Sequence, residues 1–126
     1  MVALFAVGCG MAMICSAIRY EFVYRSVKDS FPPQFQDDLT SRYAFPVLAL
    51  SPSTPLPLQA EYLKAMWGGC VAFLCLALCF FSLQELIVGC LGLIVFFVQT
   101  FSTIKSWKTY KENCDRTAVH DVKEES

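Results

Sequence analysis

The sequence predicts an all-α membrane protein with three transmembrane helices: one N-terminal span, then a C-terminal helical hairpin, with a partly helical cytoplasmic loop between them. Three observations predict this fold: the composition, two long apolar blocks and the placement of the basic residues. Of 126 residues, 56% are hydrophobic and only 17% are charged, which is too apolar for a small soluble domain. The net charge of -1 indicates no nucleic-acid partner.

The first apolar block, Val2 to Ile18, contains no Lys or Arg. It is long enough to cross a bilayer once, because a hydrocarbon core of about 30 Å takes roughly 20 helical residues. A cleaved signal peptide is the alternative, but no basic segment precedes the block, and "IRYEFVYR" follows it in place of a small-x-small cleavage site. We therefore expect a retained span whose helix extends beyond the membrane, over residues 1–30.

The second apolar block, Ala65 to Ile104, is too long for one span, since about 40 helical residues extend roughly 60 Å. It must fold back, and "SLQE", Ser82 to Glu85, supplies polar side chains near its middle. The sequence thus predicts a transmembrane hairpin over residues 57–104, with Glu85 as a solvated turn residue. The functional alternative, an intramembrane carboxylate that relays protons or pairs with a cation, stays open.

All ten basic residues fall on one side of this arrangement. They are Arg19, Arg25, Lys28, Arg42, Lys64, Lys105, Lys108, Lys111, Arg116 and Lys123. Because short loops rich in Lys and Arg stay in the cytoplasm, we expect the N-terminus outside and the loop and tail inside. Aromatic residues near the ends of the spans are the predicted interfacial anchors: Tyr20, Trp67, Trp107 and Tyr110.

The loop, residues 31–56, begins with "FPP", which should end the first helix. Pro33 is expected to open a short helix over residues 33–44. Asp37 and Asp38 then lie in its early turns, where carboxylates suit the helix dipole.

The proline-rich run that follows, residues 45–59, is expected to be extended or turned. Ser53 or Thr54 is expected to cap the next helix, which leads into the second span. The tail, residues 105–126, is predicted to begin as a helix and to end in polar, disordered residues.

Small residues recur at four-residue spacing in the first two spans. The predicted helix-packing residues are Gly8, Gly10, Ala12, Ser16, Gly68 and Ala72. In lipid, where apolar burial gives helices no reason to associate, such stripes let backbones approach closely. They predict contact between the first and second spans or between chains.

Gln99 is the second intramembrane polar candidate, and an interhelical hydrogen bond is the leading interpretation of its amide, with a ligand contact as the alternative. Six of the seven cysteines lie in predicted spans without C-x-x-C spacing, which is typical of packing residues. His120 lies in the polar tail. We expect no catalytic residue, no metal and no cofactor.

The first half of the chain resembles a known family. A single span followed by "IRY", a helical extension carrying Arg25, and then "FPPQFQDDL" and a proline-rich loop is similar to small bacterial inner-membrane proteins of the universal stress protein B type. The resemblance covers roughly residues 1–65, and the sequence departs from it by ending in a hairpin of two spans and a polar tail. It implies a bacterial inner-membrane location and a stress-related role.

Three function classes follow. The first is a small non-enzymatic membrane protein that binds a membrane-protein partner or itself, as an accessory subunit or stress-associated modulator. The second is a holin-like pore former, against which the 45-residue loop speaks. The third is a transporter or membrane-enzyme component, which the lack of His, Asp, Lys and Arg in the spans disfavours.

Overall fold

The computed structural model describes all 126 residues, and every regular element in it is helical. The elements are α1 (Val2–Lys28), the short 3-10 helix η1 (Pro33–Phe35), α2 (Asp38–Leu48), α3 (Leu56–Ser82) and α4 (Leu86–Glu124). Of these, α1, α3 and α4 are long and apolar enough to cross a membrane. The predicted all-α fold, with one N-terminal span and a C-terminal hairpin, is confirmed.

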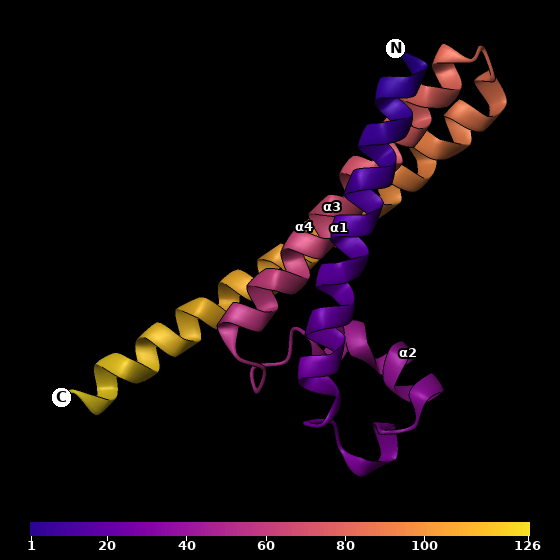
Figure 1. Cartoon of the computed structure of the whole chain (residues 1–126). Coiled ribbons are helices and arrows are strands. Elements are labelled where there is room, and N and C mark those ends of the chain that lie inside the picture. Colours follow the sequence, from indigo (N-terminus) through magenta and orange to yellow (C-terminus); the bar gives the residue numbers. More distant parts are fainter.

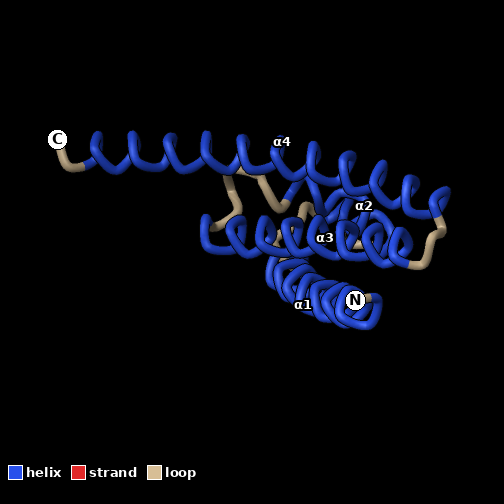
Figure 2. The backbone as a smooth tube through the Cα atoms, turned by 90° about the horizontal axis from the view of Figure 1, so that it is seen from above, coloured by secondary structure: helices blue, strands red, loops and turns tan.

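Helix α3 is the centre of the bundle. It packs along both α1 and α4, which share no comparable interface with each other, and Figure 2 shows α3 lying between them. The N-terminus and the α3–α4 turn lie together at one end, called here the turn end (Figure 1). The segment between α1 and α3 lies at the other end, the loop end, from which α4 extends away to the C-terminus (Figure 1).

The reversal between α3 and α4 takes only three residues, Leu83, Gln84 and Glu85. Gln84 has a φ of 63°, in the left-handed region. The N–H of Glu85 donates to the Phe80 carbonyl at 3.0 Å, and the N–H of Gln84 donates to the Phe81 carbonyl at 3.0 Å. This pattern is a Schellman motif, which satisfies the last carbonyls of a helix. The predicted hairpin turn at "SLQE" is therefore confirmed, and Gln84 is the residue whose backbone makes the reversal.

Glycines allow the three long helices to approach closely, and at two of them the facing residue is itself small. A Cβ atom at Gly68 would lie 3.1 Å from the Cβ of Ser16, where α1 meets α3. One at Gly92 would lie 3.2 Å from the Cβ of Ala77, where α3 meets α4. Ala77 itself is fully buried. Close backbone approach is how helices gain van der Waals contact in lipid, and here each interface of α3 uses it.

The loop differs from the expected structure in two places. The single helix expected over residues 33–44 is two elements, η1 and α2, separated at Gln36 and Asp37. The run 45–59, expected to be extended or turned, is so only over residues 49–55, because α2 continues through Pro46 to Leu48 and α3 begins at Leu56. Burial of Phe45 on the helix outweighs the bond that Pro46 cannot donate.

The expected cap of the helix before the second span is also wrong. Helix α3 starts after Pro55 without a side-chain cap, with Pro57 in its first turn. The Thr54 hydroxyl instead donates to the Leu48 carbonyl at 2.8 Å, at the end of α2. Thr54 thus gives a carbonyl at the end of α2 its hydrogen bond and does not cap α3. The start of α3 carries prolines, which have no N–H group and so need no acceptor there.

The tail is helical to Glu124, where the sequence predicted a disordered end. Residues 105–124 contain no Gly or Pro, and extending an existing helix needs no new nucleus. A pair between His120 Nδ1 and Glu124 Oε1 at 3.4 Å spans the last turn. From Asp115 onward every residue is exposed, and beyond Arg116 and Thr117, which line a pocket with the loop, this part of α4 is an arm that extends away from the bundle (Figure 1).

The close approach at Gly68 predicts that Gly68 tolerates a large side chain much less well than Gly10 does. Gly68→Leu should lower the midpoint of thermal unfolding in detergent by several degrees, since overpacking typically costs about 1–3 kcal/mol. Gly10→Leu is the matched control, because a Cβ atom there would have nothing within 4 Å. The measurement is circular dichroism of both purified variants, and equal midpoints would contradict the packing described.

Candidate functional site

The loop end contains the only extended hydrophobic core of the molecule, built around Phe45. Its fully buried ring lies edge-on to three tyrosine rings, with centroid distances of 4.8 Å to Tyr20, 5.4 Å to Tyr24 and 5.4 Å to Tyr62. Edge-to-face aromatic pairs add roughly 0.5–1.5 kcal/mol each beyond the burial of area. Because the tyrosines come from α1 and α3, the Phe45 ring fixes α2 against both helices.

Polar contacts orient α2 on this core. The hydroxyls of Tyr24 and Ser41 are hydrogen-bonded at 2.6 Å, and both residues are buried. At the start of α2, Asp38 pairs with Lys28 at the end of α1. The Lys28 hydrogen bond holds the pKa of Asp38 below its usual range, so this contact weakens only when the pH falls far enough to protonate that carboxyl.

Ion pairs divide the basic residues into two groups. Every Lys or Arg in α1, α2 and α3 has a carboxylate partner, in the pairs Arg19–Glu61, Arg25–Glu21, Lys28–Asp38, Arg42–Glu21 and Lys64–Glu61. None of the five in α4 has one: Lys105, Lys108, Lys111, Arg116 and Lys123. The sequence places all ten on one side, but only the structure shows that the five without a carboxylate partner all belong to α4.

Two buried side-chain amides join the loop to α3 and α4. The Gln59 amide, fully buried, donates to the carbonyls of Ser51 (3.1 Å) and Thr54 (2.7 Å). The Asn113 amide of α4 donates to the Gln59 side-chain oxygen and to the Leu50 carbonyl, both at 2.9 Å. Burial of these amides is tolerated because both N–H groups of each are satisfied.

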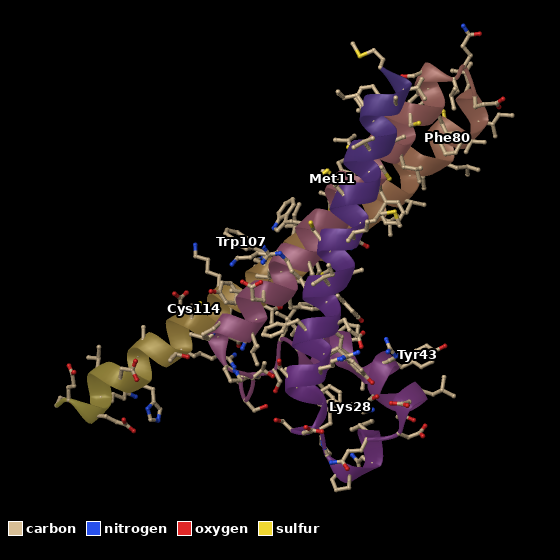
Figure 3. The ribbon with its side chains drawn as sticks, in the orientation of Figure 1. Met11, Lys28, Tyr43, Phe80, Trp107 and Cys114 are labelled. Atoms are coloured by element: carbon tan, nitrogen blue, oxygen red, sulfur yellow. The ribbon has the colours of Figure 1, made fainter.

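The outward side of α2 is apolar and uncovered. Leu39, Tyr43 and Val47 recur every four residues and expose 73%, 85% and 76% of their surface. Figure 3 shows Tyr43 at the outer edge of the molecule, directed away from α1. The three residues are called here the α2 face. Next to it, Val47, Leu50 and Lys105 take part in lining a half-open groove of about 520 Å³ between α2 and α4.

The predicted helix-packing residues lie at different places in the bundle. Ser16 donates a hydrogen bond to the Ala65 carbonyl of α3, and the Ala12 carbonyl lies 3.7 Å from where a Cβ of Gly68 would be. A Cβ atom at Gly8 would lie 3.8 Å from the Cys75 sulfur. Ala72 is buried, whereas Gly10 faces open space. The stripe on α1 therefore meets α3 within this chain.

The two intramembrane polar candidates also separate. Glu85 is exposed at the turn end, where it precedes α4 without forming a side-chain cap. Gln99 is half-buried in α4 with its amide nitrogen toward Gly69, 3.7 Å from where a Cβ would be, but the expected interhelical hydrogen bond is not formed. Within the spans, a polar contact between α3 and α4 instead joins Cys70 and Thr103 at 3.4 Å.

The four predicted anchors are of two kinds. Trp67 and Trp107 expose 44% and 49% of their surface, as side chains in contact with an interface do. Tyr20 and Tyr110 are partly buried against the Phe45 core. Tyr20 therefore packs the loop onto the bundle in addition to marking the end of the first span.

Sequence reasoning missed Gln59, Asn113 and the α2 face. No signal marks Gln59 or Asn113, since each is one polar residue among others in its segment. The α2 face did have a signal, the four-residue spacing of Leu39, Tyr43 and Val47, which is one side of a helix. It was missed because the expected helix ended at residue 44, so Val47 was assigned to the proline-rich run and not to the same helix side as Leu39 and Tyr43.

No protein-family model, curated protein or solved structure matches the chain.

The amide junction predicts a specific loss of stability. Asn113→Ala should lower the thermal unfolding midpoint by several degrees, because it leaves the buried Gln59 oxygen without a donor, at a cost of about 1–3 kcal/mol. Lys108→Ala is the control, since this exposed lysine of α4 has no carboxylate partner. If the two variants melt together, the junction does not hold α4 to the loop.

Proposed function

We propose that this chain is a small non-enzymatic membrane adaptor that binds another membrane protein through the α2 face and the adjoining groove between α2 and α4. The single observation on which the proposal rests is the α2 face itself, with three large apolar side chains mostly exposed on a helix whose other side is firmly packed. Exposed apolar patches on an ordered element are typical of protein contact sites.

The charges beside the α2 face support a particular kind of partner. Lys105 lines the groove, and Lys108 follows on the same helix, both without a carboxylate partner. An amphipathic helix of the partner that presents apolar residues to Tyr43 and Val47, and carboxylates to these lysines, would complement the surface. The Phe45 core holds α2 in place, so little ordering cost remains at binding.

The membrane context is part of the same proposal. The loop end, which carries all ten basic residues, faces the cytoplasm. The resemblance of residues 1–65 to the universal stress protein B type supports a bacterial inner membrane and a stress-linked accessory role. A non-enzymatic role is supported by the spans, which contain no His, Asp, Lys or Arg.

The proposal predicts that the α2 face is required for partner recovery. The double variant Tyr43→Ser, Val47→Ser should fold normally, because it changes only exposed side chains, and should lower recovery of a specific membrane protein at least tenfold in affinity isolation from mild detergent. The partner's contact would be checked with a photocrosslinking residue at position 39. Mass spectrometry of the crosslinked peptide then identifies the segment of the partner that lies at the contact and shows whether its residues are apolar.

The matched control is Val119→Ser, Val122→Ser, which removes two exposed valines from the arm of α4. It should leave recovery unchanged. Equal recovery by wild type and the α2-face variant, or crosslinks at position 39 to this chain alone, would overturn the adaptor proposal.

A further inference from the structure

A second surface, separate from the α2 face, lies within the spans. A half-open groove of about 350 Å³ runs between α1 and α3. Its lining combines small residues, among them Ala17, Gly69 and Ala72, with the larger apolar side chains of Met13 and Leu76. The groove is therefore mostly apolar and lies in the part of the molecule that lipid surrounds.

The groove ends at the polar boundary of the first span. Met13 and Leu76 belong to the apolar blocks, whereas Tyr20 and Glu21, which line the loop end of the groove, follow the first basic residue, Arg19. From Met13 to Glu21 the helix rises about 12 Å. An occupant thus meets apolar side chains along this length and charged ones at the end.

The lining of the groove ends at Glu21, and two arginines just outside the lining, Arg25 and Arg42, flank its carboxylate. The Glu21 carboxylate lies between two guanidinium groups, 3.1 Å from Arg25 Nε and 3.7 Å from Arg42 Nη2. Two arginines share one carboxylate, and their side chains remain 78% and 55% exposed. The Arg42 guanidinium also lies 4.7 Å from the centroid of the Tyr24 ring, which holds it in place. Exposed N–H groups on positioned arginines are suited to a phosphate.

From these features we infer that the groove is a binding site for one phospholipid, with an acyl chain between α1 and α3 and the phosphate on Arg25 and Arg42. The size of the groove decides between a lipid and a partner helix. A helix about 10 Å wide can lie only across the mouth of a groove of about 350 Å³, whereas a single acyl chain fits inside it. In a phospholipid the acyl chains are joined through glycerol to the phosphate, so one molecule can meet both the apolar groove and the arginines at its end.

The test is native mass spectrometry of the full chain in detergent, titrated with phosphatidylglycerol and, separately, with a diacylglycerol of the same acyl chains. Phosphatidylglycerol should bind as a single adduct, at least tenfold more tightly than the diacylglycerol. Arg25→Gln, Arg42→Gln should remove this preference. Equal affinity of the wild type for the two lipids would overturn the phosphate assignment.

A substitution that fills the groove with a large side chain tests whether the lipid binds there. Ala17→Phe adds a ring from an exposed position and should weaken phosphatidylglycerol binding at least tenfold, while circular dichroism stays unchanged. Ile18→Phe, at the neighbouring exposed position outside the groove lining, should bind as the wild type does. Unchanged binding in Ala17→Phe would overturn the proposal. Since neither variant touches the α2 face, this outcome is independent of the adaptor function.

Discussion

The hydrogen bond between the side-chain amides of Gln59 and Asn113 is the interaction on which the loop end depends. It joins α3 to α4 near the start of α3 and, through the carbonyls of Leu50, Ser51 and Thr54, holds the segment that leads from α2 into α3. A buried amide with unmet hydrogen bonds would cost more than the bond gains, so the segment can adopt little else. The position of α2 follows from this constraint and from the Phe45 core.

Within the spans the molecule depends on α3 in a different way. Lipid gives helices no hydrophobic reason to associate, so α3 holds its neighbours by close approach at Gly68 and Gly92 and by short polar contacts. Ser16 bonds the Ala65 carbonyl on one side, and Cys70 meets Thr103 on the other. The result is a row of three helices rather than a closed bundle, and a row leaves long lateral surfaces available to lipid or to other proteins.

The two proposed surfaces differ in the kind of occupant that each one suits. The α2 face lies outside the spans, next to lysines of α4 that have no carboxylate partner. The groove between α1 and α3 lies mostly within the spans and ends at Glu21, beside Arg25 and Arg42. Both are rigidly backed, since Phe45 fixes α2 and the bond from Ser16 fixes α1 on α3. Preorganised surfaces of this kind lose little conformational entropy when they bind.

The sequence by itself determined the features that depend on length and composition. Apolar blocks of a given length must cross a bilayer once or twice, and the longer block must reverse at its polar middle, so the three helices and the turn at Gln84 could be predicted. The tertiary structure alone decided how the loop folds. Phe45 overrode the helix-breaking tendency of Pro46 because three tyrosines from distant positions bury its ring, and sequence spacing does not show such contacts. Likewise the small-residue stripe predicted a helix contact, but its partner, α3 of the same chain, depends on which side of α1 the loop returns to.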